Sequence, residues 1–264
     1  MKNRFYGKYY KFISDSGFVF ACIDSFANEG KMLQIITDEG SFLISDTGSF
    51  NADGGVFDFD VHTGGLTVTG RLTAGEFHPL KTKVMGPFSH LPLECRHEIY
   101  SMYHTLDGTL EVNGKTVTFT GSPGYIEGDS GKNFPSRYIW YNSVGESASV
   151  TVAIATIPLF GFIRFTGVLC FIRTPDREYS ICTYNRAKAD LISKDRIVVK
   201  NGDAVFTLNI EGEGGHELKA PVKGNMDRYI KESVTLKTSY SLTANGRTLL
   251  ENEDPISSLE YMWD

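Results

Sequence analysis

Cysteine is scarce in this chain of 264 residues, and its four copies stand far apart. Cys22, Cys95, Cys170 and Cys182 form no Cys-x-x-Cys pair, so neither a structural zinc site nor a disulfide framework is indicated. Isolated reduced thiols are the expected state. A cytoplasmic location follows as the default prediction.

Long apolar runs are also missing. The longest, residues 150–163, contains Pro158 and Gly161 and is closed by Arg164, so it falls short of the roughly 20 residues of a membrane-spanning helix. Residues 1–11 have no apolar core of the length that a secretory signal needs. We predict no transmembrane segment and no export by that route, and we leave open a peripheral contact with a membrane.

Charge of one sign is nowhere concentrated. The chain has 26 Lys and Arg against 32 Asp and Glu residues, a formal net charge of −6. The most basic stretch, residues 223–237, is interrupted by Asp227 and Glu232, which is typical of a solvated face rather than of a phosphate-binding one. No nucleic-acid partner is predicted.

Three Asn-Gly pairs mark turns between β-type segments. They are Asn113-Gly114, Asn201-Gly202 and Asn245-Gly246, and such pairs tolerate the positive φ of tight hairpins. A two-residue turn at the first pair places Leu110 opposite Val117. Apolar residues alternate with polar ones beside the other two pairs, as in strands with one buried face: Phe206, Leu208, Ile210, Val234, Leu236, Tyr240 and Leu242.

The whole chain reads as all-β. No stretch of about 12 residues has an uninterrupted helical period, and residues 17–24, 32–37 and 41–46 look like short strands between turn residues. An antiparallel sandwich or barrel is predicted. A polar break at residues 145–147 suggests two β units, residues 1–144 and 145–264.

Acids and histidines gather between residues 85 and 142. Glu94, His97, Ser101 and His104 would share one face of a helix, whereas in a strand Glu94 and His104 share a face and His97 lies on the other. The strand is favoured. A His-Glu-x-x-His zinc motif is excluded because Ser101 takes the place of the second histidine. Catalytic histidines and hydrogen-bonded core histidines are both left open.

Glu127 and Asp129 alternate along the next predicted strand. In an extended chain they point the same way, about 7 Å apart, near enough for one carboxylate to raise the pKa of the other and keep a proton available for general-acid catalysis. The alternative is an acidic turn in which Asp129 caps its own loop and Lys132 pairs with a neighbour. A phosphate loop is excluded, because Ile126 and Asn133 replace the residues that it requires.

Aromatic residues follow. Tyr138, Trp140 and Asn142 would share one face of a strand. Aromatic faces of this kind either fill a core or stabilise a developing cation.

Several blocks in this order resemble the bacterial tocopherol-cyclase-like family. The blocks are MGPFS, P-x-E-C-x-H, SM-x-H, GYIE-x-D-x-G and FP-x-x-Y-x-W at residues 85–89, 92–97, 101–104, 124–131 and 134–140, continued by residues 154–163, 183–188 and 218–233. The chain departs from the family's usual tryptophans at Ser130 and Lys8, which bears on the substrate.

The resemblance implies a lipocalin-like antiparallel fold of two β units, as in carotenoid hydratases, and chemistry without a cofactor or metal. An acid would protonate a double bond of a prenylated substrate, and a hydroxyl oxygen would capture the cation. The implied donors or orienting partners are Glu94, His97, His104, Glu127 and Asp129. The implied substrate-binding residues are Phe88, Met102, Tyr125, Lys132, Phe134, Tyr138, Trp140 and Asn142.

Three hypotheses therefore stand. The first is an enzyme that cyclises or hydrates an isoprenoid or other apolar molecule. The second is a protein that carries a lipid or isoprenoid quinone in the same pocket without changing it. The third is an acidic loop that only stabilises the fold. The expected partner in the first two is an apolar small molecule.

Overall fold

The computed structural model is built almost entirely of antiparallel β-strands and describes residues 4–44, 48–159 and 163–263. Within these ranges the helical elements are two short 3-10 helices, η1 (Gly86–His90) and η2 (Thr183–Asn185). None of the helical segments in the described part of the chain has the length and apolar character needed to span a membrane. The predicted all-β class is confirmed.

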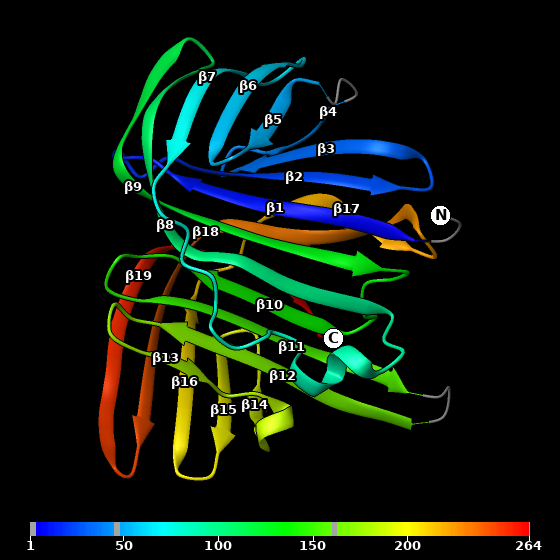
Figure 1. Cartoon of the computed structure of the whole chain (residues 1–264), viewed down its shortest axis with the longest axis vertical. Coiled ribbons are helices and arrows are strands. Elements are labelled where there is room, and N and C mark those ends of the chain that lie inside the picture. Colours follow the sequence, from blue (N-terminus) through cyan, green and yellow to red (C-terminus); the bar gives the residue numbers. More distant parts are fainter. Residues whose placement is uncertain (1–3, 45–47, 160–162, 264) are drawn as a thin grey trace.

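The first sheet has nine strands in the order β4-β3-β2-β1-β9-β8-β7-β6-β5 (Figure 1). All nine contribute to one apolar cluster that includes Phe12, Phe57 and Leu110, so the sheet curls around its own core. Its strands are β1 (Phe5–Ile13), β2 (Val19–Ala27), β3 (Gly30–Thr37), β4 (Ser41–Ile44), β5 (Phe50–Asp53), β6 (Val56–His62), β7 (Thr67–Ala74), β8 (Cys95–Val112) and β9 (Lys115–Gly131).

The second sheet has ten strands in the order β13-β12-β11-β10-β19-β18-β16-β15-β14, with β17 also paired to β18. It encloses a second core that includes Tyr141, Val152 and Leu208. Its strands are β10 (Tyr138–Ser143), β11 (Ser149–Leu159), β12 (Ile163–Arg173), β13 (Glu178–Ser180), β14 (Lys188–Ile192), β15 (Arg196–Asn201), β16 (Ala204–Glu211), β17 (His216–Val222), β18 (Asn225–Ala244) and β19 (Arg247–Met262).

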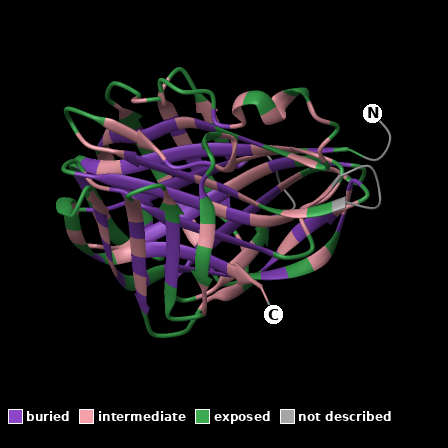
Figure 2. Ribbon diagram, turned by 90° about the horizontal axis from the view of Figure 1, so that it is seen from below, coloured by how far each residue is buried: buried purple, intermediate pink, exposed green. Residues whose placement is uncertain are grey.

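A third apolar cluster lies where the two sheets face each other. Tyr9 and Tyr125 of the first sheet meet Trp140 and Ile230 of the second in this cluster. Buried segments accordingly run along the central strands of both sheets, while exposed segments lie mainly in the loops (Figure 2). Polar side chains caught between the sheets are therefore shielded from bulk water.

The hairpins at the Asn-Gly pairs are confirmed. Leu110 lies opposite Val117, and the turn residues Asn113-Gly114 and Asn245-Gly246 have positive φ at both positions. At Asn201-Gly202 the turn is shifted by one residue, because Asn201 pairs with Ala204 and the turn is made by Gly202-Asp203. Positive φ is needed there at Gly202 alone.

Some predicted strand limits are corrected. The strand expected at residues 17–24 is β2, which begins later because Gly17, with φ of +80°, closes a turn onto Ser14. The ends of the predicted segments 41–46 and 150–163 lie partly outside the described residues. The division of the chain into units 1–144 and 145–264 stays a prediction, and β10, which precedes that boundary, belongs to the second sheet.

Replacing Gly131 by Ala should destabilise the fold beside the acidic residues of β9. Gly131 pairs with Cys95, and an added Cβ would overlap the backbone carbonyl of Glu94. We expect the free energy of unfolding to fall by about 3 kcal/mol, as for an overpacked interior, measured by urea unfolding. Gly64→Ala, at a glycine with open space around it, is the control and should change stability by less than about 0.5 kcal/mol. Equal stability of the two variants would contradict the prediction.

Candidate functional site

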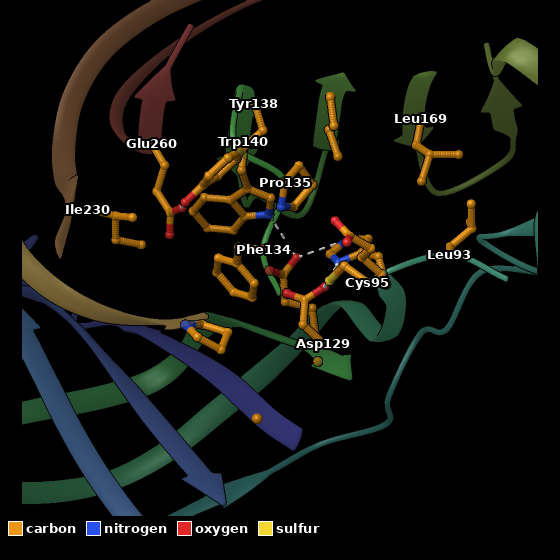
Figure 3. Close-up of a pocket in the computed structure, with 18 of the residues that line it drawn as sticks. Leu93, Cys95, Asp129, Phe134, Pro135, Tyr138, Trp140, Leu169, Ile230 and Glu260 are labelled. Atoms are coloured by element: carbon orange, nitrogen blue, oxygen red, sulfur yellow. Dashed lines mark hydrogen bonds and ion pairs between the residues drawn. The ribbon is translucent and has the colours of Figure 1, made fainter. Parts of the chain in front are cut away.

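A cavity of about 180 Å³ lies between the two sheets (Figure 3). Its walls come from β1, β2, β8 and β9 on one side and from β10, β11, β12, β17, β18 and β19 on the other. This volume is many times the roughly 15 Å³ that a single water needs, so the space suits a small organic molecule. Most of the lining is apolar, and it includes Phe5, Phe88, Leu93, Phe134, Leu169 and Ile230.

His97 stands between two carboxyl groups at the edge of this apolar space. Its Nδ1 lies 3.1 Å from Asp129 Oδ1, and its Nε2 lies 3.4 Å from Glu127 Oε2. The register of the sheet explains the arrangement, because His97 on β8 is the direct partner of Asp129 on β9, and Glu127 shares a strand face with Asp129. The thiol of Cys95 also donates to Asp129 Oδ1, at 3.5 Å.

Burial and charge set the protonation of this trio. Burial raises the pKa of Glu127 to about 7, although the charge of His97 opposes the shift. Burial lowers the pKa of His97, but the charges of Glu127 and Asp129 outweigh it and raise that pKa to about 9. At neutral pH the imidazole is therefore charged, and Glu127 is divided between its acid and carboxylate forms.

Glu127 is held by donors from both sheets. Tyr125 donates a hydrogen bond to Glu127 Oε2 at 2.5 Å, and the indole Nε1 of Trp140 donates to the same oxygen at 3.0 Å. The Tyr125 hydroxyl also lies 2.9 Å from the Thr151 hydroxyl. The Thr151 hydroxyl in turn accepts a hydrogen bond from the side-chain amide of Asn142 at 3.3 Å. Because the donors gather on Oε2, a proton on Glu127 belongs on Oε1.

Two further acids sit on the second sheet. Tyr9 donates to Glu232 Oε1 at 2.7 Å, and Tyr138 donates to Glu260 Oε2. Burial raises the pKa of Glu232 to about 8, and burial together with the charge of Glu232 raises that of Glu260 well above its usual value. The two sheets are also joined directly, because the rings of Tyr9 and Trp140 meet edge to face at 5.1 Å.

Glu232 and Glu260 of the second sheet, and Tyr9 of the first, were missed by the sequence analysis. Glu232 could have been identified from the sequence. It lies two residues before Val234 and Leu236 in the same alternating pattern, so an acid occupies a position on the predicted buried face. Tyr9 and Glu260 gave no such signal, because each reaches the site only through the pairing of strands from opposite ends of the chain.

The structure separates the residues that the sequence had grouped as one site. His97, Glu127 and Asp129 come together, with Phe88, Phe134, Tyr138 and Trp140 on the cavity wall. Glu94 is exposed at the rim of the cavity, and its carbonyl accepts from the backbone N–H of Lys132, whose side chain is exposed. Tyr125, Asn142 and Met102 are buried behind the wall.

His104 lies elsewhere. It packs against Phe57 and Phe77, and burial lowers its pKa to about 4. Register shifts in β8 at Ile99–Ser101 and Ser101–His104 each add one residue, so together they leave His97 and His104 on opposite faces of the strand.

The trio also bears on the question of a metal. Ligand atoms of His97, Glu127 and Asp129 lie within 4.8 Å of one another. His97, however, turns one ring nitrogen to each acid, whereas a metal ion binds only one nitrogen of an imidazole. The arrangement is that of an imidazole hydrogen-bonded to Asp129 and ion-paired with Glu127. Chemistry without metal or cofactor stays a prediction.

Comparison with known proteins identifies the fold. No family model and no curated protein sequence matches the chain. Among solved structures, kievitone hydratase from Nectria haematococca is 11% identical with a TM-score of 0.57, covering 99% of this chain and 90% of that one. A candidate AttH from Nitrosomonas europaea is 8% identical with a TM-score of 0.57, covering 100% and 93%.

A third solved structure, CghA with Sch210972, is 8% identical with a TM-score of 0.60, covering 98% of this chain and 88% of that one. At such identities the likeness shows the fold alone. The lipocalin-like architecture is thereby confirmed. Membership of the tocopherol-cyclase-like family stays a hypothesis.

Proposed function

We propose that this protein is an enzyme of the hydratase or cyclase type, in which Glu127 protonates a carbon–carbon double bond of an apolar substrate. The observation that carries the proposal is a carboxyl group only 4% exposed, on the wall of an apolar cavity, with a pKa raised to about 7 by burial. Catalytic acids are commonly tuned in this way.

The neighbours of Glu127 suit each stage of such a reaction. When Glu127 loses its proton to the substrate carbon, the new carboxylate forms an ion pair with the charged imidazole of His97, and Asp129 keeps that imidazole protonated. The carbocation lies in a space walled by Phe134, Tyr138 and Trp140, whose π faces stabilise positive charge.

The cation is then captured by an oxygen atom. Capture by water gives hydration, and capture by a hydroxyl group of the same molecule gives cyclisation. We infer an ortho-prenylated phenol or hydroquinone as the substrate class, in line with the sequence resemblance. One structural neighbour, kievitone hydratase, is by name a hydratase.

The test is incubation of the purified protein with an ortho-prenylated phenol in D2O. Hydration adds the mass of one water, cyclisation leaves an isomer, and both place one deuterium on the protonated carbon. Recovery of the unchanged probe from protein that it saturates would overturn the proposal in favour of a carrier.

Replacing His97 by Gln should move the alkaline limb of the rate profile upward from about pH 7. The acid form of Glu127 is the active one, so the rate falls as pH rises through its pKa. The charge of His97 lowers that pKa, and its removal therefore raises it. The measurement is kcat against pH, with the exposed His62→Gln as control. A limb that stays in place or moves to lower pH would contradict the assignment.

A further inference from the structure

Glu232 and Glu260 form a second carboxyl pair at the cavity, on the sheet opposite Glu127. They are direct partners on β18 and β19, which brings their Cβ atoms to about 5 Å. Glu232 is 0% exposed and Glu260 is 8% exposed, and Glu260 lines the cavity. Figure 3 shows Glu260 beside Tyr138 and Trp140, with Asp129 on the far side of the rings.

The pair is held in place but left incomplete. Tyr138 donates to Glu260, and Tyr9, itself 3.3 Å from Ser258, donates to Glu232 Oε1. Glu232 Oε2 is buried and has no hydrogen-bond partner among the described residues. A buried carboxyl oxygen without a partner is costly, and a proton shared with the neighbouring carboxyl relieves that cost.

The charges around the pair favour one shared proton at neutral pH. Two adjacent buried carboxylates repel each other, so both are not ionised together. The positive charge of Lys11 near Glu232 favours one ionised member. Arg228 lies over the Tyr138 ring at 5.8 Å and acts on that tyrosine. The remaining titratable groups that act on the pair are Glu127, Asp129, Tyr9 and Tyr138.

Trp140 links this pair to the proposed acid. Its indole donates to Glu127 on the first sheet, and on its own sheet it is the direct strand partner of Glu260. Trp140 therefore contacts Glu127 through its indole N–H and neighbours Glu260 in its own sheet. Glu127 and Glu260 both line the cavity, so a molecule bound there has access to a carboxyl group from each sheet.

We propose that Glu260, positioned by Glu232, accepts the proton that the attacking hydroxyl group loses. This inference rests on the proposed function. The O–H bond of Glu127 breaks as a C–H bond forms on the substrate, and the hydroxyl oxygen forms a C–O bond to the cation. The proton of that hydroxyl passes to the ionised member of the pair, and exchange with water restores both carboxyl groups before the next turnover.

The experiment compares Glu260→Gln and Glu260→Asp with Glu253→Gln, an exposed control on the same strand. With the ortho-prenylated phenol as probe, Glu260→Gln should lower kcat about 100-fold, Glu260→Asp should retain part of the activity, and Glu253→Gln should leave it unchanged. Infrared spectra of the folded variants at neutral pH should show a protonated-carboxyl band that is altered only by the changes at Glu260.

Glu232→Gln tests the positioning role. In the proposal Glu232 and Glu260 share one proton, and an amide at position 232 cannot take up that proton, so the acid limb of the rate profile should shift, which a purely structural residue would not cause. Full activity of Glu260→Gln together with an inactive Glu127→Gln would overturn this inference and leave the proposed function standing. Absence of turnover by the unaltered protein would overturn both.

Discussion

Glu127→Gln should lower kcat by about 1,000-fold, within the range that a positioned general acid contributes. The amide oxygen can still accept hydrogen bonds from Tyr125 and Trp140, so the site should keep its shape while losing the proton that it donates. The measurement is turnover of the ortho-prenylated phenol at a pH below about 7, where most Glu127 is protonated in the unaltered protein.

Two further variants show whether the effect is specific to Glu127. Glu111→Gln, at an exposed position of β8, should leave kcat unchanged. Asp129→Asn should lower kcat only about tenfold, because Asp129 acts through the charge of His97. If the acidic residues only stabilised the fold, Glu127→Gln would lower the melting temperature and spare turnover. Full turnover in this variant would remove Glu127 from the mechanism.

The fold could be predicted from the sequence because its signals are local. Asn113-Gly114 and Asn245-Gly246 demand positive φ, and the period-two pattern around each pair sets the buried face of its hairpin. The order of the strands could not be predicted. The pairing of β1 with β9, or of β10 with β19, depends on contacts between distant segments that leave no local pattern.

For a similar reason, only the local part of the candidate site could be predicted from the sequence. Alternation along a strand put Glu127 and Asp129 on one face, and both do contact His97. The choice of His97 as their partner could not be derived. Extending the register of Leu110 and Val117 without irregularity places His97 opposite Ser130, and the register shifts between β8 and β9 bring it to Asp129 instead. A slip of one residue reverses which face a side chain occupies.

The stability of the protein should fall as pH rises from 6.5 to 8. The fold raises the pKa from 4.5 to about 8 in Glu232, from 4.5 to about 7 in Glu127 and from 6.5 to about 9 in His97, and it also raises that of Glu260. A raised pKa contributes stability that is complete below the unfolded value and is lost as pH rises through the folded value. In this window the native state holds protons that the unfolded chain has released.

Groups with the opposite shift act outside this window. The lowered pKa of His104 makes stability rise between pH 4 and 6.5, and that of Lys11 has the same effect between pH 8 and 10.5. With at least two protons at about 1.4 kcal/mol for each pH unit, and allowance for coupling between sites, we expect a loss of about 3 kcal/mol or more. Urea unfolding at constant ionic strength measures it.

Glu232→Gln supplies the internal control for this pH dependence. The amide cannot take up a proton, so the variant should show a smaller fall in stability between pH 6.5 and 8. The matched change at the exposed Glu253 should keep the whole slope. Stability that stays constant or rises across this window in the unaltered protein would mean that Glu232 and His97 do not hold protons in the native state. That result would also contradict the proposal that Glu232 and Glu260 share a proton in the native state.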